Sequence, residues 1–361
     1  MRRSALWGVA ALLAGACAAV ADTIPIVTNA LGTVTWVEDT SGPVYNPPGK
    51  AYYPTVVERG GTYTMWSENA TGEQMATSTD GINWTTIGQV TGLQNPAHAV
   101  VEDLGGTYRI WYWSGQIYSI GAIRTATSSN GLDWSGDTAI AQAGTTVITG
   151  RSSSDWNYGS YGPEDILYNP AGSAALVDPK DPASVWKNRY VMYYDGDTGG
   201  HESIGLAVSS DGVTWTGYQG GAAPVLNSSS SGWDSGYVGY GTVIRVGANE
   251  FDLYYSGGTG STLNQGIGFA TSTDGIDWVK SGSNPIFSIF DGVNWREERT
   301  YTPMVIGDQM WFTGVSSNGT YAIDYAYAEP EVPEPATLGA GMLGMLLALL
   351  AAFRRGRAAR C

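Results

Sequence analysis

The stretch "ATSTDGINW" (Ala76–Trp84) decides the fold, because the chain repeats it three more times. The copies are "ATSSNGLDW" (126–134), "AVSSDGVTW" (207–215) and "ATSTDGIDW" (270–278), with Trp-to-Trp spacings of 50, 81 and 63 residues. Repeats of this size are typical of architectures built by reusing one small structural unit. The chain therefore repeats one unit at least four times.

The aspartate of this repeat is predicted to be structural. The second copy carries Asn130 where the first has Asp80. Either side chain offers an oxygen to backbone N–H groups in an Asx turn, whereas a catalytic charge would be lost with asparagine. Gly81 would then supply the left-handed conformation of the turn, and Trp84 would pack against a neighbouring unit.

Two kinds of strand precede each repeat and predict an all-β fold. The aromatic strands are "YTMWS" (63–67), "YRIWYW" (108–113), "YVMYY" (190–194), "FDLYY" (251–255) and "MWFTGV" (310–315). The aliphatic strands before them are "PTVVE" (54–58), "HAVVE" (98–102), "EDILY" (164–168), "GTVIR" (241–245) and "PMVIG" (303–307). With the small-residue strand and the Trp-led strand of each repeat, this order predicts a five-bladed β-propeller of four-stranded antiparallel blades.

The fifth blade has no Trp-led strand of its own, and the start of the chain offers one. "WVEDTSGPVY" (36–45) is similar to "WVKSGSNPIF" (278–287), the outer strand of blade 4. We therefore expect residues 34–45 to complete blade 5, which would close the ring and remove an open sheet edge. The propeller is assigned to residues 34–329.

Both ends of the chain have the character of processing signals. Residues 1–21 combine a basic start, an apolar run and a small-residue site, so we expect a signal peptide cleaved before Asp22, and hence export. Cys17 as a lipoprotein cysteine is the alternative. Residues 330–361 contain an apolar segment, 336–353, followed by four arginines. At about 1.5 Å per residue, the segment would span roughly 27 Å as a helix, enough to cross a bilayer.

The C-terminal end resembles the PEP-CTERM sorting signal of Gram-negative bacteria, with Pro333, Glu334 and Pro335 as the motif. The resemblance implies an exosortase as partner, transient contact with the inner membrane, and a final place in the cell envelope, on the outer surface or in the extracellular matrix. A plain membrane anchor is the alternative.

The charge of residues 22–330 limits the partners. This region holds 12 Lys and Arg against 31 Asp and Glu, a net charge of −19. Nucleic acid and anionic lipid are poor partners for such a surface. Both cysteines, Cys17 and Cys361, lie in the terminal signals, so the fold is expected to form without disulfides.

The repeats and aromatic strands together resemble the five-bladed propellers of the arabinanase, levansucrase and invertase superfamily, which includes glycoside hydrolase families 43, 32 and 130. The resemblance covers nearly all of residues 34–329 and implies a glycan substrate bound at the mouth of the central channel. It implies a glycoside hydrolase-like enzyme that uses carboxylates. The alternatives are a non-catalytic glycan-binding or matrix propeller and a purely structural surface protein.

The topology places the Asp-Gly turns on one face and directs the search for chemistry to the other. The catalytic candidates there are Asp165, Glu164, Asp195 and Glu202, with Asp165 or Glu164 as the acid. A hydrogen-bonded pair that only stabilises its loop is the alternative for Glu164 and Asp165. The family 43 triad is not transferred, because Tyr53, Asn95 and Tyr161 stand near the positions where that family has acids.

Aromatic, basic and histidine side chains in the same loops are candidates for binding substrate. Sugar rings stack on aromatic rings, and guanidinium groups bind carboxylates or phosphates. The candidates are His98, His201, Arg151, Arg299, Trp156, Tyr158, Tyr161, Tyr240 and Trp295. Catalysis by carboxylates requires no cofactor, although "DGDTGGHE" (195–202) has oxygen-rich spacing that could hold a calcium ion in the channel.

Overall fold

The structure is a computed structural model that describes residues 34–39, 41–115, 122–142, 155–158, 162–178, 180–197, 201–259, 265–293 and 295–330. The signal peptide, the sorting motif and the segment 336–353 lie outside these residues. The described part of the chain is all-β, as predicted, with one short α-helix, α1 (Pro182–Val185), and one 3₁₀ turn, η1 (Tyr218–Gly221).

Units 1 and 2 are separate four-stranded antiparallel sheets in which the strands follow chain order. Unit 1 contains β2 (Tyr52–Arg59), β3 (Thr62–Asn69), β4 (Gly72–Ser78) and β5 (Thr85–Gln89). Unit 2 contains β6 (Pro96–Asp103), β7 (Tyr108–Ser114), β8 (Ala122–Ser128) and β9 (Ser135–Ala139). In both, the aliphatic strand comes first and the aromatic strand second, as the sequence predicts.

Units 3 and 4 have the same antiparallel order and are joined by one parallel bridge, Glu202 to Tyr237. Unit 3 contains β11 (Gly162–Tyr168), β12 (Tyr190–Asp197), β13 (Glu202–Ser209) and β14 (Thr214–Gly217), with β10 (Ala141–Gln142) added in parallel to β14. Unit 4 contains β15 (Tyr237–Gly247), β16 (Glu250–Gly258), β17 (Gly266–Ser272) and two short outer strands, β18 (Val279–Lys280) and β19 (Phe287–Ser288).

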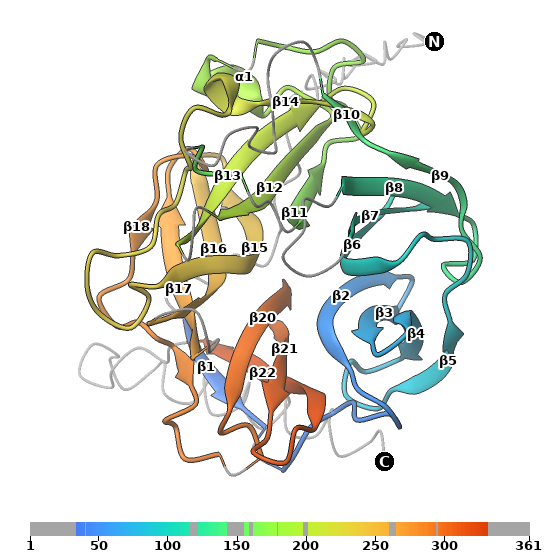
Figure 1. The fold of residues 1–361 in the computed structure, drawn as a ribbon, viewed down its shortest axis with the longest axis vertical. Helices are drawn as coiled ribbons and strands as arrows, with labels where there is room; N and C mark the ends of the chain where they lie inside the picture. Colours follow the sequence, from blue (N-terminus) through green and yellow to red (C-terminus); the bar gives the residue numbers. More distant parts are fainter. Residues whose placement is uncertain are drawn as a thin grey trace, which may run out of the picture.

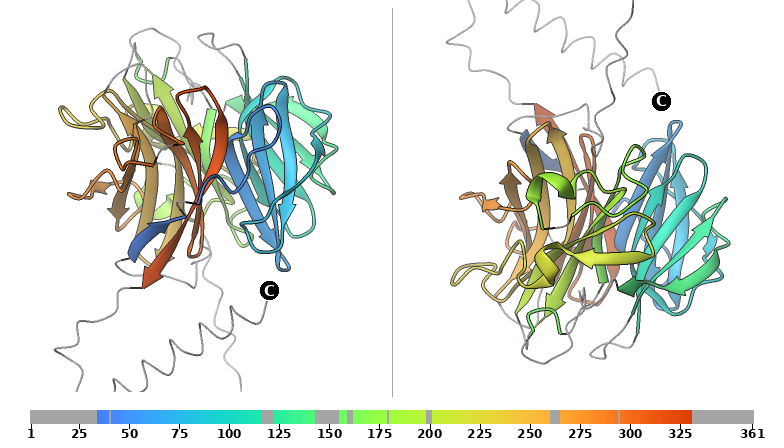
Figure 2. Two further views of the ribbon diagram at one scale, coloured as in Figure 1. Left: turned by 90° about the horizontal axis from the view of Figure 1, so that it is seen from below. Right: turned by 90° about the horizontal axis from the view of Figure 1, so that it is seen from above.

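Unit 5 takes its outer strand from the other end of the chain. It contains β20 (Arg299–Ile306), β21 (Gln309–Val315), β22 (Tyr321–Pro330) and β1 (Val34–Glu38). β1 pairs antiparallel with β22, and Tyr45 forms a further bridge to Ile323. The first strands β2, β6, β11, β15 and β20 lie nearest the centre of Figure 1, and Figure 2 shows the sheets upright beside one another.

The repeated turns have the predicted Asx geometry. Asp80 Oδ1 accepts hydrogen bonds from the backbone N–H groups of Ile82 and Asn83, at 2.9 and 2.7 Å. Asn130 Oδ1 accepts the same pair of bonds from the two residues at the corresponding positions of its own turn, both at 2.9 Å. The prediction that the repeated aspartate is structural is confirmed.

Each repeated turn also receives a hydrogen bond from the aromatic strand of the preceding unit. The donors and acceptors are Trp66 to Gly131, Trp111 to Gly212, Tyr193 to Gly275 and Trp311 to Gly81, with distances of 2.6–2.8 Å from side chain to carbonyl oxygen. Units 4 and 5 meet differently, through Trp36 Nε1 and the Tyr254 hydroxyl at 3.3 Å. Hydrophobic clusters fill the spaces between neighbouring units.

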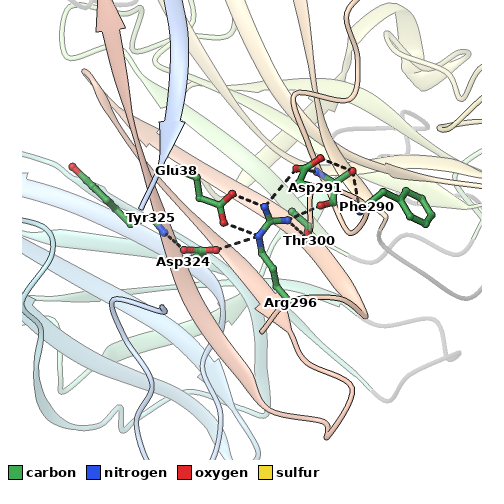
Figure 3. A network of polar contacts seen from close by, with 8 residues as sticks. Glu38, Phe290, Asp291, Arg296, Thr300, Asp324 and Tyr325 are labelled. Atoms are coloured by element: carbon green, nitrogen blue, oxygen red, sulfur yellow. Dashed lines mark hydrogen bonds and ion pairs between the residues drawn. The ribbon is translucent and has the colours of Figure 1, made fainter. Parts of the chain in front are cut away.

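A buried ion-pair network fixes β1 to unit 5 (Figure 3). The Arg296 side chain is 1% exposed and donates from Nε to Glu38 Oε1 on β1 at 2.8 Å. It also lies 3.3 Å from a carboxylate oxygen of Asp324 on β22 and donates to the hydroxyl of Thr300. Arg296 therefore pairs with acids from β1 and β22 that lie far from it in the sequence.

Candidate active site

The five first strands share a backbone irregularity that shapes the centre of the molecule. The register shifts near the start of each strand, between Tyr52 and Thr55 in β2 and between Pro163 and Asp165 in β11. The shifts in β6, β15 and β20 follow the same pattern. Such bulges re-aim side chains and are common beside functional sites. Residues from all five shifts line one small cavity of about 40 Å³.

Four of these bulges hold a non-glycine residue with positive φ: Tyr53, His98, Tyr240 and Thr302, at 49–55°. Side chains rarely adopt this conformation, so the surrounding structure must maintain it. In unit 3 the shift instead leaves Glu164 outside the ladder pairing. Unit 3 therefore presents a carboxylate at the level where units 1, 2 and 4 present rings.

Three of the four predicted catalytic carboxylates converge at this level, around Gly239 of β15. A methyl group on Gly239 would lie 3.0 Å from Glu164 Oε1, 3.5 Å from Glu202 Oε2 and 4.0 Å from Asp195 Cβ. The two glutamate oxygens are therefore at most about 6.5 Å apart. Glu164 and Glu202 are partly exposed, whereas Asp195 is 1% exposed. We call Glu164, Asp195 and Glu202 the carboxylate cluster.

The cluster favours the protonated form of its members. Burial raises the pKa of Glu164 to about 8, and the proximity of Asp165 adds to this effect. Burial and the neighbouring Glu164 raise the pKa of Glu202 to about 8 and that of Asp195 well above its usual range. Within the described part of the chain, neither Glu164 Oε1 nor Glu202 Oε2 has a hydrogen-bond partner, although both atoms are buried. Buried unsatisfied oxygens of this kind are rare and often mark a functional site.

Asp165, predicted as one of the two likeliest acids, has a different position. Its Oδ2 accepts from the backbone N–H of Val243 at 2.6 Å and from the Thr242 hydroxyl at 3.2 Å. Its Oδ1 accepts from the N–H of Ile166 at 2.8 Å. Thr55 makes the corresponding contact in unit 1, accepting from the N–H of Val101. Asp165 therefore joins the first strands of units 3 and 4, and burial raises its pKa to about 7.

One carboxylate at this level was missed by the sequence reasoning. Glu68, at the end of β3, accepts from the Tyr52 hydroxyl at 2.9 Å and from the N–H of His98 at 3.2 Å. Burial raises its pKa to about 7. It pairs across the ladder with Glu73, whose side chain is 0% exposed and whose carboxylate oxygens have no hydrogen-bond partner among the described residues.

Aromatic rings surround the cavity and include two of the predicted binding residues. The His98 ring stacks on Tyr53 with 4.1 Å between ring centroids. Tyr240 meets both rings edge to face, at 5.1 Å from Tyr53 and 5.3 Å from His98. The carboxylate cluster raises the pKa of Tyr240 further, in addition to the larger effect of burial. His98 and Tyr240 therefore lie beside the cluster.

Of the other predicted binding residues, two lie outside the residues that the structure describes, and the rest contribute no ring to this cluster. Trp156 donates from Nε1 to the Gly221 carbonyl at 2.8 Å and packs on Gly205, while Trp295 packs on Gly314. Both side chains pack within their own units, 3 and 5. Tyr158 forms a turn with Asp155, His201 is exposed, and Arg299 begins β20 beside Tyr301. Arg151 and Tyr161 lie outside the described residues.

The described residues contain neither a metal-binding cluster nor a membrane-spanning helix. In the described ranges, no three His, Cys, Asp or Glu side chains are placed to hold a metal ion. The calcium site stays a prediction, since residues 198–200 of its loop are outside those ranges. No helix in the described chain is long and apolar enough to cross a membrane.

Solved structures that are described as glycoside hydrolases have a fold similar to that of this chain. One similar structure, described as a glycoside hydrolase, has a TM-score of 0.59 at 15% identity over 87% of this chain and 94% of its own. A structure from work on the GH130 family of mannoside phosphorylases has a TM-score of 0.52 at 17% identity, covering 85% and 96% of the two chains.

A thermostable family-43 glycoside hydrolase has a TM-score of 0.51 at 15% identity, covering 81% of this chain and 94% of its own. No protein-family model and no curated protein sequence matches the chain. At these identities the likeness establishes the fold alone.

Proposed function

We propose that the protein is an exported five-bladed propeller, closed by β1, that acts as a glycoside hydrolase-like enzyme on extracellular polysaccharide at the mouth of its central channel. The observation that carries this proposal is the convergence of Glu164, Asp195 and Glu202 around Gly239. Three carboxyl groups this close cannot all ionise, so at least one holds a proton at neutral pH. The similarity of fold to glycoside hydrolases supports the same reading.

The chemistry requires one carboxylic acid and one carboxylate. Glu164, with a pKa of about 8, is the acid that protonates the glycosidic oxygen as the leaving group departs. Glu202 is the partner on the sugar's opposite side, either as nucleophile or as base for water. Because its pKa is also about 8, the form with Glu164 protonated and Glu202 ionised is populated mainly near that pH. One oxygen of Glu164 lies at most about 6.5 Å from one oxygen of Glu202, so both groups can act on a single glycosidic bond.

Release of reducing ends tests the enzyme directly. Wild type, Glu164→Gln and Glu202→Gln are incubated with arabinan, xylan, fructan, mannan and the host's own exopolysaccharide. We expect product from wild type on at least one glycan and a loss of 10²-fold or more in each variant. Asp165→Asn separates the two assignments, because loss of activity at unchanged stability would return the acid to Asp165.

The size of the cavity favours one alternative, a non-catalytic glycan-binding propeller. A volume of about 40 Å³ is far below the roughly 300–1,000 Å³ of small-molecule sites, because Tyr53, His98 and Tyr240 occupy the centre. This alternative predicts binding of a glycan by wild type and both variants, with no product from any of them. That result would rule out the enzyme.

Export and sorting are further parts of the proposal. Residues 1–21 would direct secretion, and Pro333, Glu334 and Pro335 would be read by an exosortase after transient insertion of residues 336–353 in the inner membrane. Replacing the three motif residues by alanine should leave the protein in the inner-membrane fraction. Unchanged release to the outer surface would remove the sorting motif from the proposal.

A further inference from the structure

Two cations border one tyrosine at the seam between units 5 and 1. Arg299 pairs with Val315 across the sheet, and Val315 pairs with Tyr321. Directly paired residues present their side chains on the same face, so the three lie in one row. On the other side of Tyr321, Lys50 Nζ lies 4.3 Å from the centre of its ring.

This row faces unit 1, and its two end residues, Arg299 and Tyr321, are partly exposed, whereas Val315 is buried. Tyr321 lies 5.2 Å from Tyr52, and Tyr301, two residues after Arg299, lies 5.5 Å from Tyr53, as measured between ring centroids. Arg299 also donates a hydrogen bond to the Tyr301 hydroxyl. Lys50, Tyr52, Arg299 and Tyr321 are all partly exposed. A ligand on this face of the protein can therefore reach both cations.

Lys50 and Arg299 belong to the seven of eleven Lys and Arg side chains in the described ranges that form no ion pair with a carboxylate. Arg59, Arg124, Lys280 and Arg296 each form an ion pair with a carboxylate. Over the described ranges, neither Lys50 nor Arg299 has a carboxylate oxygen within 4.0 Å. In a region with a net charge of −19, an anionic ligand is repelled over much of the surface, so its charge would be stabilised where two cations that have no ion pair among the described residues border one ring.

We call Lys50, Arg299 and Tyr321 the cationic seam. The ring of Tyr53 lies between the cationic seam and the carboxylate cluster. Tyr53 contacts Tyr301 on the seam side; on the cluster side it stacks on His98 and meets Tyr240 edge to face. Tyr237, the bridge partner of Glu202, lies close enough to Arg299 for the guanidinium to oppose the rise in its pKa that burial causes. A glycan of a few sugar units could therefore contact both sites.

We propose that Lys50 and Arg299 form a subsite for the carboxylate of a uronic acid residue, so that the glycan is an acidic polysaccharide. The assignment rests on the proposed function for the glycan itself. A planar guanidinium binds a carboxylate through two parallel hydrogen bonds, and the ammonium adds a second charge. Sulfate and phosphate esters offer similar oxyanions, and the test below separates them from uronates.

Calorimetric titration of the folded, full-length protein provides the test. The probes are oligogalacturonate, glucuronoxylan and alginate oligosaccharides, each beside its carboxyl-reduced, neutral counterpart. We expect at least one acidic form to bind tenfold or more tightly than its neutral form, with the difference shrinking as salt is added. Arg299→Gln should lower affinity for the acidic form about 10- to 100-fold and leave the neutral form unchanged.

The controls fix the interpretation. Arg299→Lys should recover part of the preference, Lys50→Gln should lower it, and Lys187→Gln, an exposed cation elsewhere, should leave it unchanged. Equal affinity in all three pairs, or an unaltered preference in folded Arg299→Gln, would overturn the subsite. Tighter binding of sulfated galactan, or displacement of uronate by millimolar inorganic phosphate, would overturn the carboxylate assignment.

Turnover separates this idea from the proposed function. Glu164→Gln and Glu202→Gln should keep the preference for acidic glycans while losing hydrolysis. Hydrolysis of a neutral glycan, with no preference for binding acidic glycans, would contradict the uronate subsite and support the enzymatic function. A preference for binding acidic glycans, with no hydrolysis of any glycan, would support the uronate subsite and contradict the enzymatic function.

Discussion

The Arg296 side chain donates to Glu38 at 2.8 Å across 258 residues of sequence. Arg296 lies just before β20, while Glu38 is the last residue of β1. Both side chains are almost completely withdrawn from solvent, at 1% and 9% exposure. The first described strand is thus held to unit 5 by a charge pair in addition to its ladder hydrogen bonds.

Loss of this pair should destabilise the fold strongly. Arg296→Met would leave the Glu38 carboxylate buried and uncompensated, and breaking a buried pair from one side costs about 3–5 kcal/mol. We expect that reduction in the free energy of unfolding, measured by urea denaturation with tryptophan fluorescence. The matched control is Arg59→Met, because the Arg59–Asp103 pair is 35% and 23% exposed and should be worth about 0–1 kcal/mol. Equal losses in both variants would contradict the structural role of Arg296.

The repeated turn predicts a difference between two substitutions at one position. Asp80→Asn should be almost neutral, because Asn130 accepts the same two backbone hydrogen bonds in the second repeat. Asp80→Ala removes the acceptor and should cost about 1 kcal/mol. Thermal unfolding of the two variants in parallel gives the comparison. If Asp80→Asn lost as much as Asp80→Ala, the charge rather than the turn would be what matters.

The architecture was predictable because its signals are local. The "AxSxDGxxW" repeats specify a turn and a packing tryptophan within nine residues, and the structure has both. The similarity of 36–45 to 278–287 was also readable, and β1 pairs with β22 beside it. The partners of Arg296 could not be read, because Glu38 and Asp324 reach it only after the sheet has assembled.

The sequence allowed the members of the carboxylate cluster to be named, but not the way in which they converge. Glu164, Asp195 and Glu202 were named from their loops, whereas their convergence depends on the bulge at Glu164 and on Gly239 having no side chain. Glu68 was missed although the sequence held a signal. In "YTMWSE" and "YVMYYD" the acid occupies the same place, which makes Glu68 the counterpart of Asp195. The partners of Asp165 could not be predicted, because they belong to the next unit.

The raised pKa values predict that stability falls as pH rises. Glu164 and Glu202 have pKa values of about 8 in the folded state, against about 4.3 for an unfolded glutamate. The folded state therefore binds more protons between these limits, and the free energy of unfolding decreases as pH rises from about 4.5 to 8. The double variant Glu164→Gln, Glu202→Gln should unfold at higher urea than wild type at pH 8, by on the order of 1–3 kcal/mol, and equally at pH 4.

A charge control completes the pH experiment. Glu329→Gln removes an exposed carboxylate and should change the free energy of unfolding by the same small amount at pH 4 and at pH 8. The measurement is the urea midpoint at half-unit steps from pH 4 to pH 8.5. A wild-type curve that stays flat above pH 5, or a double variant that keeps the wild-type slope, would mean that the cluster is ionised in the folded protein.

Gly239 provides the most local test of the carboxylate cluster. A methyl group there would come within 3.0 Å of Glu164 Oε1, closer than real contacts normally allow, while the backbone of Gly239 has no positive φ that would itself disfavour alanine. Gly239→Ala should therefore push Glu164 away from Glu202, lower the rate of reducing-end release at least tenfold, and cost about 1–3 kcal/mol of stability through overpacking. Gly282→Ala is the matched control, because nothing lies within 4 Å of the added methyl. Gly239→Ala with wild-type turnover would show that the close approach of the carboxylates is not needed for the reaction.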